Sequence, residues 1–206
     1  MARYLLTHSL LSAWQYSMEE NPYEDATNEA DPMGDFLKVL RREPREPTEA
    51  MQNGIDFEDM VTSIANGAEW QTDKDHRWYN AAAKVADIVR GGSFQFKARK
   101  QIEVAGTPIL LYGILDVLKA GTIYDVKFSK SYDRGKYIDS TQHPTYFELV
   151  PEAFAFKYLV SNGSSVWTET YRRDETPSII PVAADFLGWL EAVDLMDVYR
   201  KNWVAL

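Results

Sequence analysis

Residues 113–128 read Gly113-Ile-Leu-Asp116-Val-Leu-Lys-Ala-Gly-Thr-Ile-Tyr-Asp125-Val-Lys127-Phe128, and this stretch decides the predicted fold. Apolar and β-branched residues on both sides of Ala120-Gly121 predict two strands joined by a tight turn. If the turn has two residues, Asp116 lies opposite Asp125 on one face, and Lys127 shares that face because side chains alternate along a strand. A three-residue turn would break this register.

Two opposed carboxylates would destabilise this hairpin, because they repel each other when no cation lies between them. Magnesium prefers oxygen ligands and takes one or two carboxylates together with water and substrate phosphate. We therefore expect a Mg²⁺ or Mn²⁺ site at Asp116 and Asp125. Lys127 would face the same phosphate, to offset developing charge or to help activate the attacking water. An ordinary Asp–Lys pair on a solvated strand face is the alternative, which the apolar surroundings disfavour.

The rest of the chain surrounds this hairpin with alternating helical and extended patterns. The strand pattern also predicts a strand before the hairpin and one after it, so that the expected strands cover residues 94–104, 109–118, 122–128 and 165–171. Helical periodicity predicts helices over residues 7–18, 48–66, 75–90, 143–160 and 182–203, with a helical turn or two over 35–42. Pro151 should kink or divide the fourth helix. Residues 21–34 and 129–140 are expected to be loops.

This order of elements predicts an α/β domain with a central mixed sheet flanked by helices. We expect one domain, with residues 1–47 as a helical and acidic-loop extension and 48–206 as the core. The predicted buried faces of the first three long helices are Leu10, Leu11, Trp14 and Met18; Phe57, Val61 and Ile64; and Ala81, Val85, Ile88 and Val89.

Composition narrows the classes of function. The 206 residues are 45% hydrophobic and include no cysteine, which excludes disulfides, iron–sulfur clusters and thiolate zinc sites. No apolar run approaches a membrane span, and the first residues do not resemble a signal peptide, so we expect a cytoplasmic protein. The net charge of -9 is the wrong sign for a nucleic-acid binder. Acidic residues crowd positions 19–35, however, and a metal-dependent nuclease itself needs a carboxylate cluster.

Four short motifs, taken in order, resemble one family. They are Gly54-x-x-Phe57-Glu58, Gly113-x-x-Asp116, Asp125-x-Lys127 and Gln142-x-x-x-Tyr146. Together they cover about half the chain and resemble the motif series of RecB-like nucleases in the PD-(D/E)xK superfamily, which includes phage-type exonucleases. The resemblance implies a restriction-endonuclease-like core.

The resemblance also implies roles for individual residues. Asp116 and Asp125 would bind the metal, with the backbone carbonyl of Val126 as a third ligand and Glu58 completing the shell. Lys127 would be the catalytic lysine, and Gln142 and Tyr146 would help to place the lysine or the DNA backbone. Without the family, Glu58 is a solvated helix residue and Tyr146 a core residue.

The chain departs from the family in two respects. Gly54 stands where many relatives carry a histidine, and the absence of cysteine excludes the iron–sulfur branch. Pro144 predicts that the helix begins near it, so that Gln142 precedes the helix.

The expected function is therefore a Mg²⁺-dependent deoxyribonuclease. The resemblance favours an exonuclease acting on DNA ends in phage or prophage recombination or repair, with DNA and a separate recombination or single-strand-annealing protein as partners. A structure-specific or restriction-type endonuclease is one alternative, and a non-catalytic nucleic-acid-binding protein is another. The oligomeric state stays open. Basic residues near the hairpin predict a phosphate channel, with an ordinary solvated edge as the alternative: Lys97, Arg99, Lys100, Lys130, Arg134 and Lys136.

Overall fold

The longest strand, β3 (Thr107–Lys119), organises the sheet of this computed structural model, which describes residues 3–19, 31–68 and 72–205. One edge of β3 pairs along its length with β2 (Ser93–Val104). The other edge pairs first with β1 (Tyr4–Leu6) and then with β4 (Thr122–Phe128). The resulting six-stranded sheet is mixed and continues through β5 (Ala155–Ser161) to β6 (Val166–Arg172). The predicted α/β class with a central mixed sheet is therefore confirmed.

Both hairpins of β3 have tight two-residue turns. Positive φ angles of 47° and 71° at Ala120 and Gly121 are those of a turn with both central residues in the left-handed region. The resulting register pairs Lys119 with Thr122 and Leu118 with Ile123, as predicted. The pairing ends at Val117 and Tyr124, so the predicted pair of Asp116 and Asp125 does not form, because the two strands separate there. Ala105 and Gly106 turn the β2–β3 hairpin in the same way.

The predicted helix over residues 143–160 is wrong in its second half. Helix α5 covers only Gln142–Leu149, and Ala155–Ser161 forms β5, which runs parallel to β4. Pro151 lies between the two elements and cannot continue the helical hydrogen bonding. Strand β5 was missed because it is buried on both faces, and a continuous apolar run does not distinguish a strand from a helix.

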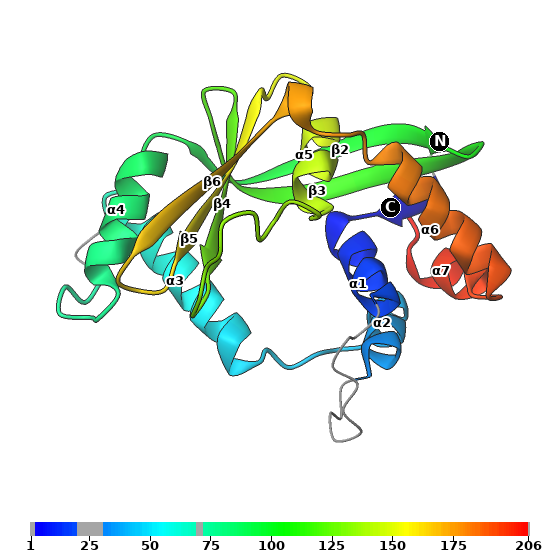
Figure 1. The fold of residues 1–206 in the computed structure, drawn as a ribbon, viewed down its shortest axis with the longest axis horizontal. Coiled ribbons are helices and arrows are strands. Elements are labelled where there is room, and N and C mark those ends of the chain that lie inside the picture. The colour runs from blue at the N-terminus through cyan, green and yellow to red at the C-terminus, as the bar shows by residue number, and fades with distance from the viewer. Residues whose placement is uncertain (1–2, 20–30, 69–71, 206) are drawn as a thin grey trace.

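Helices cover both faces of the sheet (Figure 1). Helices α3 (Glu49–Ala65) and α4 (Tyr79–Val89) pack on one face through a core that includes Phe57, Val61 and Val85. The second core lies on the opposite face. It joins the sheet to α1 (His8–Met18), α2 (Pro32–Leu40), α5, α6 (Ile180–Ala192) and α7 (Met196–Asn202).

Several predicted boundaries need correction. Helix α2 begins at Pro32 because Asp31 caps it, accepting a hydrogen bond from the Gly34 N–H at 2.7 Å. The rest of the predicted loop, residues 21–30, lies outside the described residues. The predicted closing helix is two helices, divided near Asp194, whose φ is 58°.

Other corrections concern burial and short elements. Met18 and Ile88 were expected in the core but are 49% and 37% exposed. Strand β1 was not predicted, because three residues are too short to show a period. It brings the start of the chain into the sheet, and Leu6, Leu10 and Leu11 are fully buried. In the described part of the chain, no helix combines the length and the apolar character needed to cross a membrane.

Candidate active site

Asp116, Asp125 and Glu58, together with Lys127, form a polar cluster that we call the carboxylate cluster. It lies where one edge of β3 has no pairing strand. Strand β1 pairs with β3 only as far as Leu111, and β4 pairs with it only from Val117 onward. Buried backbone groups in such a gap need other partners. The Tyr146 hydroxyl donates to the Ile114 carbonyl at 2.7 Å. Strand β4 separates from β3 beyond this pairing, and there the Val126 N–H donates to Asp116 Oδ2 at 2.8 Å.

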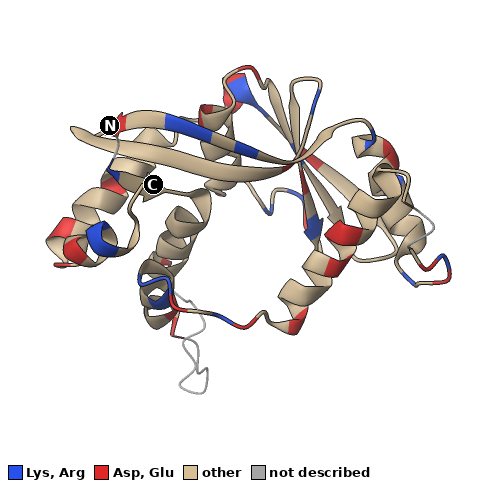
Figure 2. Cartoon of the chain, turned by 180° about the vertical axis from the view of Figure 1, so that it is seen from behind, with Lys and Arg blue, Asp and Glu red and all other residues tan. Residues whose placement is uncertain are grey.

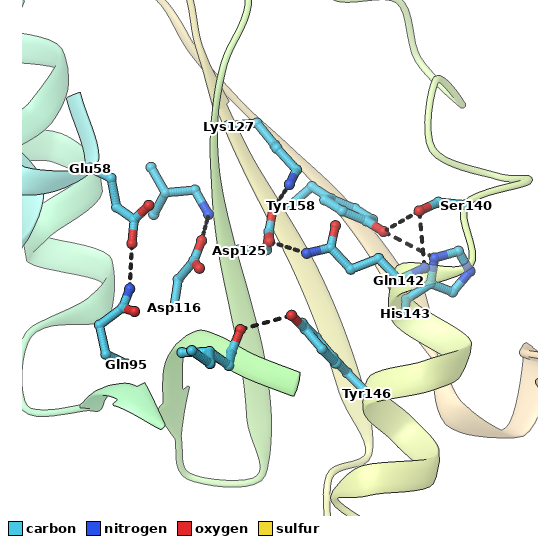
Figure 3. A network of polar contacts seen from close by, with 12 residues as sticks. Glu58, Gln95, Asp116, Asp125, Lys127, Ser140, Gln142, His143, Tyr146 and Tyr158 are labelled. Atoms are coloured by element: carbon cyan, nitrogen blue, oxygen red, sulfur yellow. Dashed lines mark hydrogen bonds and ion pairs between the residues drawn. The ribbon is translucent and has the colours of Figure 1, made fainter. Parts of the chain in front are cut away.

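Asp125 and Lys127 project from β4 into this gap (Figure 3). The Asp125 side chain is only 3% exposed and forms an ion pair of 2.8 Å with Lys127 Nζ. Gln142, the first residue of α5, donates from Nε2 to Asp125 Oδ1. The helix thus includes Gln142, contrary to the prediction, and Pro144 lies in its first turn. The Lys127 side chain remains 34% exposed, while its ammonium contacts the Asp125 carboxylate.

Glu58 approaches from α3, on the other side of β4, and is held by a residue that the sequence analysis missed (Figure 3). Gln95 Nε2 donates to Glu58 Oε1 at 2.6 Å. The β2–β3 register places Gln95 opposite Asp116, and this is the one position of the hairpin where no pairing forms. Gln95 has a φ of 49°. Counting from the Ala105-Gly106 turn would have identified Gln95, as counting from the next turn identified Asp125.

The three carboxylates influence one another. The pKa of Asp116 is raised well above the usual carboxyl range, first by burial and then by the charges of Asp125 and Glu58. The pKa of Glu58 is also raised, by burial and by Asp125. Burial lowers the pKa of Lys127, but its interactions with Asp125 and Asp116 outweigh this effect and leave that pKa above the ordinary lysine value. The cluster therefore concentrates negative charge around one ammonium group.

This charge pattern suits a divalent cation bound to two carboxylates. Asp125 Oδ2 is buried, and its partner among the described residues is the Lys127 ammonium, 2.8 Å away. Within the same residues, no three His, Asp or Glu side chains group closely enough to hold a metal ion alone. Glu58 is engaged by Gln95, whereas Asp116 and Asp125 supply the two carboxylates that Mg²⁺ commonly uses.

His8 of α1 and Tyr146 of α5 also lie near the cluster. The ring of His8, the first residue of α1, packs edge-on against Tyr146, with centroids 5.3 Å apart. The Thr141 hydroxyl donates to the His8 carbonyl at 3.1 Å. Burial, and then the charge of Lys127, lowers the pKa of His8 to about 4, so the imidazole is neutral. No local pattern indicated His8, because tertiary packing alone brings α1 to β4.

Tyr146 is both a core residue and a neighbour of the cluster. Its side chain is 3% exposed, and its hydroxyl reaches the backbone of β3. His143, the next residue after Gln142, is directed away from the carboxylates (Figure 3). Its ring stacks on Tyr171 with centroids 4.1 Å apart, and Nδ1 lies 3.2 Å from the Tyr158 hydroxyl.

The predicted basic residues divide into two groups. Lys97 and Arg99 are exposed on β2, where Figure 2 shows positive charge along the strand. Lys100 instead forms an ion pair of 2.5 Å with Glu148 of α5. The second group, in the loop of residues 129–140 after Lys127, is also exposed and consists of Lys130, Arg134 and Lys136.

Comparison with known proteins gives no family assignment. No family model matches the chain, and no curated protein matches it. Among solved structures, the crystal structure of SSO0001 aligns with 76% of this chain and 85% of that chain, at 15% sequence identity and a TM-score of 0.43. A likeness at this level carries no argument about function.

Proposed function

We propose that this chain is a metal-dependent deoxyribonuclease that hydrolyses phosphodiester bonds, acting as an exonuclease from DNA ends. The observation that supports it best is the convergence of Asp116, Asp125 and Lys127 where β3 and β4 separate. A buried carboxylate pair with one ammonium group is costly to fold and binds a cation and a phosphate well. The end preference rests on the RecB-like motif order alone.

Each residue of the cluster has a defined task in this proposal. Asp116 and Asp125 would hold Mg²⁺ or Mn²⁺, with the Val126 carbonyl as a further ligand. Glu58 would join them only after leaving its hydrogen bond to Gln95. The ion would supply Lewis-acid polarisation of the phosphate and a bound water of lowered pKa. Lys127 holds its positive charge 2.8 Å from Asp125, where it would offset the charge of the phosphate oxygens. Gln142 orients Asp125 through its hydrogen bond to Oδ1.

The acidic balance of the chain is compatible with this proposal. Lys97 and Arg99 are exposed on β2, which pairs with β3, and the basic residues of the loop that follows Lys127 are exposed as well. These residues would bind DNA phosphates, while the acids at the centre are offset by the metal. Because the proposed substrate is DNA, we propose the cytoplasm as the compartment.

The test is digestion of linear duplex, closed-circular duplex and single-stranded DNA, with Mg²⁺ or Mn²⁺ and with EDTA. Wild type is compared with Lys127→Ala and with Lys201→Ala, which removes an exposed lysine on α7. We expect wild type and the Lys201 variant to degrade linear DNA only, and only with metal. We expect the Lys127 variant to be inactive.

Other outcomes have definite meanings. Cleavage of circular duplex would replace the exonuclease with the endonuclease alternative. Binding without cleavage of any substrate would favour a non-catalytic nucleic-acid-binding protein. Equal activity of the Lys127 and Lys201 variants would overturn the assignment of the active site.

A further inference from the structure

A surface pocket of 520 Å³ lies at the free edge of the sheet, beyond β5 from the carboxylate cluster. It is formed by four consecutive residues of β6, from both faces of this edge strand, and by the loop of residues 129–140. We call it the edge pocket, and its lining residues are Tyr132, Arg134, Trp167, Thr168, Glu169 and Thr170. The proposed chemistry uses none of them except Arg134, which was expected to bind DNA.

The strand register connects the edge pocket to the cluster. Lys127 pairs with Val160, and Val160 pairs with Trp167. Directly paired residues share a face, so Lys127 and Trp167 lie on the same side of the sheet. With strands about 4.8 Å apart, their Cα atoms are separated by roughly 10 Å. A DNA strand with one phosphate beside Lys127 would therefore reach the edge pocket.

The walls of the edge pocket are held in place by Glu169. This side chain is 8% exposed, and it accepts hydrogen bonds from the hydroxyls of Tyr132, at 2.6 Å, and Tyr171. The backbone N–H groups of Gly135 and Tyr137 also donate to it, at 3.2 Å and 3.4 Å. Four donors fix the loop against β6 and leave the carboxylate saturated. The edge pocket is therefore rigid. Glu169 also has no free lone pair with which to bind a metal ion.

The accessible chemistry of the edge pocket is aromatic and cationic. The rings of Tyr132 and Trp167 lie 5.5 Å apart at an interplanar angle of 31°, and both residues are half-buried. Arg134 is exposed at the rim, and the hydroxyls of Thr168 and Thr170 are the remaining polar groups. Nucleobases stack on aromatic side chains whatever their sequence, and arginine binds the phosphate that accompanies each base.

We propose that the edge pocket binds an unpaired nucleobase of the substrate strand, close to the nucleotide whose phosphate lies at the carboxylate cluster. This inference rests on the proposed nuclease function. It adds that the enzyme holds its substrate strand single-stranded at this position, with Trp167 and Tyr132 as the stacking surface and Arg134 on the adjoining phosphate.

The test is an abasic scan with wild-type protein. A series of single-stranded oligonucleotides, each with one abasic position at a defined distance from the cleaved bond, is assayed for KM and kcat with Mg²⁺. We expect one position, or two adjacent ones, to raise KM roughly tenfold, the size of one lost base–aromatic stack. In Trp167→Ala, KM for intact DNA should rise by a similar factor, and the penalty for that abasic position should disappear.

Matched controls separate stacking from damage to the fold. Phe154→Ala removes a different aromatic side chain, 62% exposed, at the opposite end of the same strands, and should leave the scan unchanged. Arg134→Ala removes an exposed side chain, so the fold should not suffer. It should weaken binding for every oligonucleotide alike and lower the salt dependence by about one phosphate contact.

The outcomes distinguish this inference from the proposed function. If wild type cleaves DNA but no abasic position raises KM, the edge pocket does not hold a base, and the nuclease assignment stands. The same conclusion follows if the Trp167 variant keeps the wild-type profile. If wild type neither cleaves nor binds DNA, both proposals fail.

Discussion

The backbone N–H of Val126 donates a hydrogen bond of 2.8 Å to Oδ2 of Asp116, across the point where β3 and β4 separate. The Asp116 side chain thus replaces the partner that the neighbouring strand would have supplied. It also holds its carboxylate beside Asp125, where burial and like charge raise its pKa well above the usual range. One side chain therefore closes the gap in the sheet and places negative charge in it.

Asp116→Asn should separate these two tasks. Asparagine keeps an oxygen acceptor for the Val126 N–H but removes the charge, so we expect a folded protein with metal-dependent DNA cleavage reduced roughly 1,000-fold. Asp116→Ala should also lose about 1–3 kcal/mol of stability, because the N–H is left without a partner. Cleavage assays and urea unfolding of both variants check this, and wild-type cleavage by the asparagine variant would contradict it.

The same substitution should stabilise the metal-free protein near neutral pH. A carboxyl group whose pKa is higher in the folded state than in the unfolded state stabilises the fold only while protonated, so this contribution is lost as pH rises. In EDTA at pH 7.5, Asp116→Asn should therefore have a higher Tm than wild type. The difference should shrink toward about pH 4, where carboxyl groups become protonated in both states. A Tm difference that does not change with pH would argue against a raised pKa of Asp116 in the folded protein.

Gln142→Ala should weaken catalysis without unfolding the protein. It removes the hydrogen bond to Asp125 Oδ1 and leaves that buried oxygen without its donor. Loss of a residue that orients a metal ligand typically costs 10- to 100-fold in metal affinity or activity, and we expect a loss of about that size. Titration of activity with Mg²⁺ measures it. The control is Gln101→Ala, an exposed position on β2, which should behave as wild type.

Gly113→Ala should disturb the site indirectly. A Cβ atom there would lie 2.5 Å from Tyr146 Cε1 and 2.9 Å from Leu149 Cδ1, so α5 must shift away from β3. Because α5 begins with Gln142, we expect lower activity together with a loss of about 1–3 kcal/mol of stability.

The matched control for Gly113 is Gly54→Ala. No atom lies within 4 Å of the added Cβ, and alanine is the better helix former by about 1 kcal/mol, so this variant should be active and slightly more stable. Urea unfolding and cleavage rates of both glycine variants provide the comparison. Equal effects would mean that close packing of α5 on β3 does not matter.

His143 should make the fold sensitive to acid. Burial lowers its pKa to about 4, whereas an unfolded histidine has a value near 6.5. The unfolded state therefore binds more protons between these values, and stability falls as pH decreases from about 6.5 to 4. The full contribution is roughly 3 kcal/mol. His143→Gln should flatten the pH dependence of unfolding over this window.

The pH profile of the glutamine variant should not become level, because burial also lowers the pKa of His8 to about 4. His8→Gln should remove a further part of the slope. If neither substitution changes the profile, the two imidazoles are not held neutral by the fold.

The hairpin at the centre of the fold was predictable from residues 113–128 because its causes are local. Strand alternation and a Gly-containing two-residue turn determine which residues oppose each other near the turn, so the shared face of Asp125 and Lys127 and the nearness of Asp116 could be expected from counting. The separation of the two strands beyond Val117 could not. The helices α1, α3 and α4 were also predictable, since each has an apolar stripe and α1 and α3 have a threonine cap.

Long-range packing decided the rest. Strand β5 is extended because it lies buried between β4 and β6, although its apolar run is equally suited to a helix. Strand β1 ends at Leu6 and leaves part of the β3 edge free, and α5 and α1 bring Gln142 and His8 to that gap. Contacts between residues more than a hundred positions apart, such as Thr141 with His8, leave no periodic trace in the sequence, and only the tertiary structure determines them.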